Sequence, residues 1–431
     1  MPVLLFILYC GFCGFGILKI PFFRKSGIRP PFLLTLFGLH VLVGCLHNWI
    51  AWRFYPEHGD IWFYFQLSFL ERHWLLHDTH LFLYYNSGWD IVSHNTITYI
   101  HVILDWLSFD DMWINTLLFS FPVFLGNTAL YRVFSRQFPG SPLSAATAFL
   151  LPSTLFWTSC IHREAVLFML LGLLFYWLDQ GFASKTTSRD HMSTATDPSP
   201  AFASRPLLFA ACSFLAITIF RFAVAITLIP AVLTWMLTLR PPTRRQGWII
   251  GGAGAALLLF LAVPQLSARL LVRITAQQHS FMVLKGNSML YLPALDGTWG
   301  SFLKAAPAAL RNSLFEPLPG SGGQHIYLLF ALELLLLWAI VATALIRRSV
   351  NQRAAGSLAT AASPFSRCCI LFALLGMLQI GLIIPFAGAI IRYRSIYLPF
   401  LVAPCLFSLR NWPPFRKLNT WLSKAFPINY D

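Results

Sequence analysis

The residue with the clearest capacity for chemistry in this chain is Asp60, which follows a long apolar segment. It lies in the motif GDIWFYF (59–65), where a glycine permits a sharp turn before an aromatic run. A carboxylate at a membrane surface could act as a general base toward an acceptor hydroxyl, with His58 as a supporting residue. Alternatively, Asp60 caps a helix that begins near Ile61.

Histidines gather in the same segment. His73 and His77 are four residues apart, so on a helix they share one face. With Asp78 or His80 they could bind a divalent metal ion. The alternative is that their rings pack among lipid headgroups, since no tight signature such as HExxH is present. A metal cofactor therefore stays open.

Arginines form a second group of candidates. Arg163 and Glu164 end the segment PSTLFWTSCIHRE (152–164), and Arg221 stands alone between two apolar runs. Guanidinium groups bind phosphate through paired hydrogen bonds, so Arg163 and Arg221 could hold an anionic substrate. The alternatives are a charged turn, with Glu164 as a supporting or pairing group, and arginine reaching for headgroups.

Two further charged sites lie late in the chain. Arg392 and Arg394 flank a tyrosine near the last apolar run, and they are candidates for binding the same phosphate. Glu333 is a carboxylate inside a strongly apolar run, LELL (332–335). Such a group is expected to face a bundle interior or a wet cavity, either as an ion or proton site or as a partner for an arginine.

The composition identifies the elements that must position these residues. Apolar residues make up 57% of 431 and charged residues only 11%, against about 25% charged in soluble domains. The mean hydropathy is +0.64. The formal charge of +15 comes from basic residues in short loops between apolar runs, which is typical of cytoplasmic loops. We therefore expect an all-α membrane protein and no nucleic-acid partner.

Apolar runs long enough to cross a bilayer number about eleven. The predicted spans are 3–20, 31–52, 113–131, 143–158, 165–181, 206–220, 222–239, 248–264, 326–346, 368–387 and 395–409. They predict one polytopic transmembrane domain over 1–431.

The basic loops predict the orientation. They fall on one side if the N-terminus is outside and the C-terminus is cytoplasmic. This topology leaves two outer loops, 53–112 and 265–325, and a cytoplasmic loop over 183–205. The first outer loop interleaves aromatic, polar and apolar residues, which predicts helices lying in the membrane interface.

Taken together, these features resemble the membrane-embedded glycosyltransferases of the GT-C superfamily, in particular the bacterial protein mannosyltransferases and lipopolysaccharide sugar transferases. The resemblance rests on the GDIWFYF motif at the head of the first outer loop, the segment 152–164, and the Arg-x-Arg at 392–394. The chain departs from the family plan in an extra N-terminal span, and it lacks a clear second acidic motif.

The resemblance implies an inverting sugar transfer from a polyprenyl-phosphate donor at the outer face of the bacterial inner membrane. The acceptor would be a glycan, a lipid or a protein. Asp60 would be the base, and Arg392, Arg394 or Arg221 would hold the donor phosphate. No nucleotide-binding fingerprint is present, which fits a lipid-carried donor.

Other functions remain compatible with the same residues. A transporter or flippase for a lipid-linked glycan would use the arginines and Glu333 without chemistry. A polysaccharide polymerase or ligase would share the phosphate site but depend less on Asp60. A non-enzymatic subunit of an envelope complex would need neither.

Overall fold

The computed structural model describes residues 2–55, 59–86, 96–190, 204–239, 264–284, 288–318, 325–355, 363–424 and 426. Among them every element is a helix, apart from an isolated bridge between Met289 and Phe386. His58 and the predicted span over 248–264 lie outside the described residues. The chain forms two compact units, Met1–Ala225 with Arg410–Asp431, and Ile226–Leu409.

Unit 1 consists of eleven labelled helices and the first part of a twelfth. They are α1 (Pro2–Lys19), α2 (Pro21–Arg24), α3 (Pro30–Phe54), α4 (Gly59–His77), α5 (Thr79–Tyr85), α7 (Thr96–Ser108), α8 (Met112–Gln137), α9 (Pro142–Leu150), α10 (Pro152–Thr158), α11 (Arg163–Asp190), α12 (Ser204–Thr238, in part) and α20 (Pro413–Leu422). Proline opens many of these helices because it lacks the N–H that a first turn leaves unbonded.

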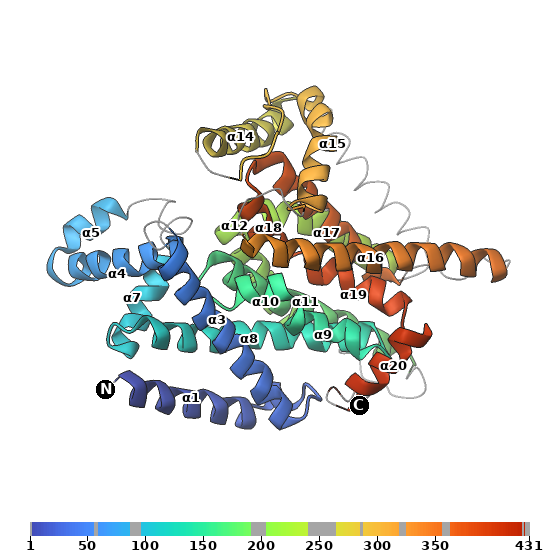
Figure 1. Ribbon diagram of the computed structural model, residues 1–431, viewed down its shortest axis with the longest axis horizontal. Helices are drawn as coiled ribbons and strands as arrows, with labels where there is room; N and C mark the ends of the chain where they lie inside the picture. Colours follow the sequence, from blue (N-terminus) through green and yellow to red (C-terminus); the bar gives the residue numbers. More distant parts are fainter. Residues whose placement is uncertain are drawn as a thin grey trace, which may run out of the picture. The chain divides into compact units, whose positions relative to one another are not determined.

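The long helix α8 is the centre of unit 1 and contacts α1, α3, α7, α9 and α11. Its contact with α11 is a backbone-to-backbone crossing. A Cβ on Gly172 would overlap the carbonyl of Gly126, and one on Gly126 would overlap the backbone of Met169. Small residues allow such close approach between helices in a bilayer. Figure 1 shows α4, α5 and α7 grouped together beside one end of α8.

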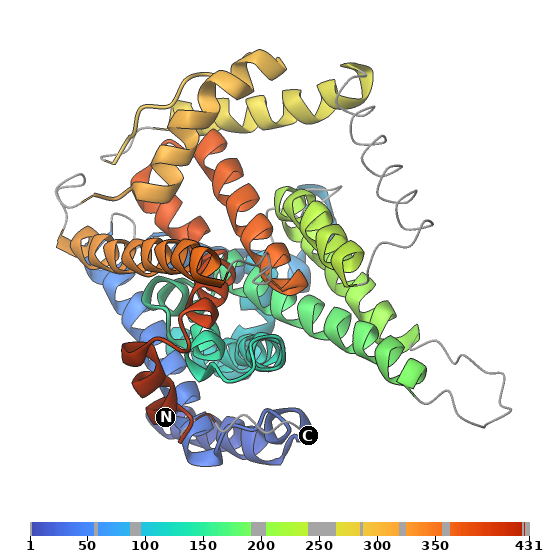
Figure 2. The same cartoon turned by 90° about the vertical axis from the view of Figure 1, so that its right-hand side faces the viewer.

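Unit 2 holds the remainder of α12 and six further labelled helices. They are α14 (Pro264–Val283), α15 (Trp299–Phe315), α16 (His325–Ala355), α17 (Pro364–Ile383), α18 (Ala387–Arg394) and α19 (Leu398–Ser408). Here α17 contacts α14, α15, α18 and α19. Both views place α14 beside α15 (Figure 1, Figure 2), and Leu271, Phe302 and Ala305 form one apolar cluster there.

Seven helices in the described part of the chain are long and apolar enough to cross a membrane, or up to eight if the bent pair α18 and α19 counts as one. They are α1, α3, α8, α11 to Phe182, α12 from Arg205, α16 from Tyr327 to Arg347, and α17. Their apolar side chains remain exposed, as at Leu4, Leu8 and Phe12 of α1, which a lipid-facing surface explains. The fold therefore defines an α-helical membrane protein with many spans.

Two stretches of predicted spans are interrupted. The runs 206–220 and 222–239 correspond to α12, in which two helical parts meet at a kink at Arg221. The predicted span 143–158 is divided into the short helices α9 and α10, because Pro152 cannot continue the hydrogen bonding of α9. The total of eleven spans stays a prediction.

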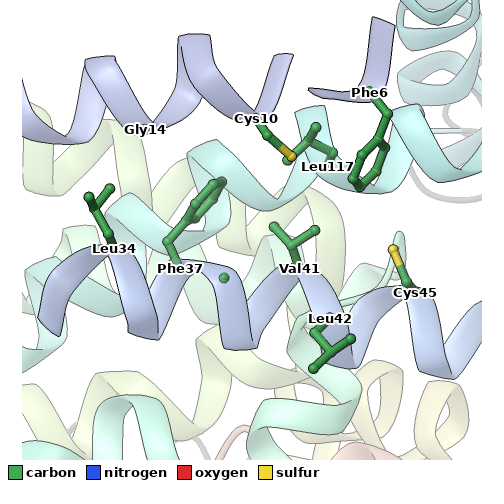
Figure 3. Close-up of a pocket in the computed structure, with 10 residues that line it drawn as sticks. Phe6, Cys10, Gly14, Leu34, Phe37, Val41, Leu42, Cys45 and Leu117 are labelled. Atoms are coloured by element: carbon green, nitrogen blue, oxygen red, sulfur yellow. The ribbon is translucent and has the colours of Figure 1, made fainter. Parts of the chain in front are cut away.

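An apolar cavity of about 390 Å³ lies between α1 and α3. Figure 3 shows Phe6 and Cys10 of α1 facing Phe37 and Val41 of α3 across it, with Leu117 of α8 behind. Its lining contains no charged residue. Apolar surface of this kind suits lipid chains and does not provide a site for chemistry.

Candidate functional site

One apolar cluster in unit 1 joins the segments that carry several predicted site residues. We call it the Ile61 cluster, and its buried members are Ile61, Phe65, Ile97, Met112, Phe119, Val123, Cys160, Ile161, Ala165 and Val166. Phe220 of α12 packs against it. Asp60, Glu164 and Arg221 are each the chain neighbour of a residue in or against this cluster. The Ile61 cluster therefore joins the segments that carry these three residues, and Glu164 and Arg221 are also in direct contact.

Asp60 lies in the first turn of α4. The helix begins at Gly59, whose φ of +70° is the left-handed conformation that glycine adopts readily. Asp60 is thus inside the helix, because α4 begins two residues earlier than a helix capped by Asp60 would. Its side chain is exposed, and a carboxylate in a first turn is favoured by the helix dipole.

Glu164 and Arg221 form an ion pair. Arg221 Nη1 lies 3.2 Å from Glu164 Oε1, and the side chains are 23% and 0% exposed respectively. The Arg221 backbone is not helical, with φ −158° and ψ 84°. The pair therefore links the first turn of α11 to the break in α12. The neighbouring Arg163 is half-buried.

A second group at this site was missed by the sequence analysis. His47 of α3 lies with Cys160 and His162, from the connection between α10 and α11, so that one ligand atom from each is within 4.8 Å of the others. All three residues are buried. The available signal was His47 itself, an imidazole inside a spanning helix.

The histidines of α4 are placed as the sequence predicted, but their metal site is not assembled. The rings of His73 and His77 lie 4.8 Å apart, so they share one face. Asp78 instead caps α5 by accepting a hydrogen bond from the Leu81 N–H at 3.0 Å. In the described part of the chain, His47, Cys160 and His162 are the group whose ligand atoms converge.

Two buried carboxylates add polar structure to α4 and α7. Asp105 is 1% exposed and accepts hydrogen bonds from Ser68 Oγ and Asn115 Nδ2. Burial raises its pKa above the ordinary 3.8, and nearby Asp110 adds to this, while the two hydrogen bonds lower it. Burial likewise raises the pKa of Glu71, partly offset by Asn86. Asp105 therefore links α7 to α4 and α8, and Glu71 links α4 to the C-cap of α5.

The late arginines belong to unit 2 and have different surroundings. Arg394 is 3% exposed, and its Nη1 donates to the carbonyls of Ser313 at 2.9 Å and Glu316 at 2.7 Å. Arg394 thus ties α18 to the end of α15. Glu333 of α16 is buried, at 9% exposure. Arg392 is half-buried and lies beside the Tyr393 ring.

Comparison of the chain with protein-family models, with curated proteins and with solved structures finds no match. Its fold and its site therefore carry the functional argument.

Proposed function

We propose that this membrane protein is a glycosyltransferase of the GT-C kind. It transfers a sugar from a polyprenyl-phosphate donor to a glycan, lipid or protein acceptor, with inversion at the anomeric carbon. The reaction takes place at the outer, periplasmic face of the inner membrane, with the N-terminus outside and the C-terminus in the cytoplasm.

The observation that carries the proposal is the Ile61 cluster. It supports an exposed acid at the head of α4, beside a segment that bears Arg163, Glu164 and the Arg221 pair. A polyprenyl phosphate is confined to the bilayer, so its phosphate arrives at headgroup depth. A base and a cation on segments that belong to one apolar cluster, each close to a helix end, suit such a substrate.

In the proposed mechanism Asp60 accepts the proton of the acceptor hydroxyl as its oxygen attacks the anomeric carbon. The bond from that carbon to the phosphate oxygen breaks, and polyprenyl phosphate leaves with the electron pair. Arg221 and Arg163 offset the charge that develops on this phosphate. A guanidinium has five N–H donors, so Arg221 can hold Glu164 through Nη1 and bind phosphate through others.

Arg392 and Arg394 remain candidates for the donor phosphate in the proposal. Arg394 Nη1 donates to two backbone carbonyls, which also gives that side chain a structural task. His58, Glu164 and Glu333 keep supporting roles in the proposal.

The test is sugar transfer by purified protein in lipid nanodiscs, with a pool of polyprenyl-phosphate sugars and detection of labelled acceptor. Asp60→Asn should reduce transfer by roughly 10²–10⁴-fold, the usual contribution of a general base. Asp110→Asn is the matched control, because Asp110 is a half-exposed carboxylate on the same stretch of chain that pairs with Arg72. Transfer at the wild-type rate by Asp60→Asn would exclude Asp60 as the base.

A transporter or flippase of lipid-linked glycans is the second candidate. Two observations favour it: α12 is broken at Arg221, and α18 and α19 meet at 61°. Discontinuous spanning helices are common at substrate sites in transporters. Proteoliposomes distinguish the two functions, because a flippase moves a labelled lipid-linked sugar between leaflets and leaves its phosphate bond intact. A polymerase or ligase would instead extend a lipid-linked glycan.

A further inference from the structure

We propose that His47, Cys160 and His162 form a binding site for a divalent cation that prefers sulfur and nitrogen ligands, with Zn²⁺ as the best match. A thiolate and two imidazoles are ligands that zinc takes readily, whereas Mg²⁺ and Ca²⁺ require oxygen. The site is separate from Asp60 and does not depend on the proposed transfer reaction.

The geometry is close to that of a bound ion. One ligand atom of each residue lies within 4.8 Å of the other two. Ligands at about 2.0–2.3 Å from tetrahedral zinc lie roughly 3.5 Å apart. The side chains would need to close by about one ångström around the ion.

The backbone holds the three ligands in place. Cys160 and His162 are separated by one residue in the turn that joins α10 to α11, where the His162 N–H bonds to the Cys160 carbonyl at 2.8 Å. His47 comes from α3, which approaches this turn at Gly44: a Cβ there would overlap the carbonyl of Ser159. The glycine is therefore what allows α3 and the turn to share a site.

The three proposed ligands are buried among aromatic rings. His47, Cys160 and His162 are 6%, 0% and 3% exposed. The ring of Phe156 lies 4.2 Å from that of His47, and Trp157 contacts both histidines. A tetrahedral ion with three protein ligands keeps a fourth position for water or another oxygen ligand. An ion here would clamp α3 to the turn directly before Arg163 and Glu164.

Cobalt provides the test, because Co²⁺ replaces zinc and reports a cysteine ligand through a thiolate charge-transfer band. Chelator-treated protein without an affinity tag is titrated with Co²⁺ and then with Zn²⁺. We expect one Co²⁺ per chain with the thiolate band, displaced by Zn²⁺. Cys160→Ser should lose the band, and His47→Gln and His162→Gln should weaken binding at least tenfold.

The controls are His40→Gln, a buried histidine on the same helix, and Cys368→Ser, a buried thiol in unit 2. Both should bind Co²⁺ like the wild type. A wild-type protein without the band, or a band that survives in Cys160→Ser, would overturn the proposal. Should the ligand variants fail to fold, the wild type alone decides: Zn²⁺ must raise its melting temperature at stoichiometric concentration, and a lack of shift counts against the site.

Discussion

Arg221 Nη1 lies 3.2 Å from Glu164 Oε1 and joins the break in α12 to the first turn of α11. The carboxylate is fully buried, so the arginine offsets a charge that could not otherwise remain ionised there at low cost. The two residues are 57 positions apart in the chain. Their contact decides where the break in α12 lies relative to α11.

Removing either member of this pair should destabilise unit 1. Loss of one partner of a fully buried pair costs about 3–5 kcal/mol, and the 23% exposure of Arg221 puts the expected loss for Arg221→Gln toward the lower end. Glu164→Gln should cost less, because it leaves the more exposed group unpaired. Thermal unfolding in detergent measures the stability of both variants. The double variant should lose less stability than the two single variants lose together.

The Arg72–Asp110 pair supplies the comparison. It is bidentate, at 2.6 and 2.9 Å, but its side chains are 19% and 43% exposed. Exposed pairs contribute about 0–1 kcal/mol, so Asp110→Asn should change stability little. Equal losses from Asp110→Asn and Arg221→Gln would contradict the importance assigned to burial.

Gly44 should tolerate no larger side chain. Gly44→Ala places a Cβ over the Ser159 carbonyl and 2.9 Å from Thr116 Cγ2, and overpacking of this kind costs about 1–3 kcal/mol. Gly38→Ala is the matched control on the same helix, because nothing lies within 4 Å of its added Cβ. We expect a lower melting temperature for Gly44→Ala alone. A similar melting temperature for both variants would show that α3 does not approach the turn this closely.

Asp105 should make stability depend on pH. Its pKa is raised in the folded state, chiefly by burial, so the folded protein holds the proton more tightly than the unfolded chain. The stabilisation is fully present below the ordinary value of 3.8 and is lost as pH rises through the folded pKa. Asp105→Asn should flatten the fall in melting temperature above pH 4. If the melting temperature of Asp105→Asn depends on pH as in the wild type, the role assigned to Asp105 is contradicted.

The orientation can be tested by cysteine labelling. Thr79 and Ser349 are both exposed, and basic residues around Ser349 predict a cytoplasmic position for it. A membrane-impermeant maleimide should label Thr79→Cys in intact cells and Ser349→Cys only after permeabilisation, in a background where exposed Cys212 is serine. Because α12 is one helix with an interior break, it could cross once or twice. Labelling of both positions from outside would contradict the predicted orientation.

Much of the helical architecture was predictable from the sequence. Long apolar runs predicted the helices α1, α3, α8, α11, α16 and α17, since hydropathy and length are local properties. The path through 206–239 was not predictable, because a lone arginine between apolar runs fits a turn between two spans as well as a break within one.

The site was predictable only in part. Asp60, Glu164 and Arg221 stood out because charges beside apolar runs are rare. It could not be predicted that their segments belong to one apolar cluster, because the Ile61 cluster joins residues more than 100 positions apart through tertiary packing. His47 was overlooked because a single imidazole in a span has no local pattern, and its partners are identified only by the fold.

The glycine crossing of α8 and α11 also limits how this protein can move. With the Gly126 carbonyl against Gly172, neither helix can slide along the other without driving a side chain into backbone. The two helices should therefore move together as one rigid body, and Glu164, at one end of α11, should move with them. Any opening that admits a substrate must then come from neighbouring helices, such as α4 or the broken α12. The contact between α8 and α11 would keep the same register throughout a working cycle.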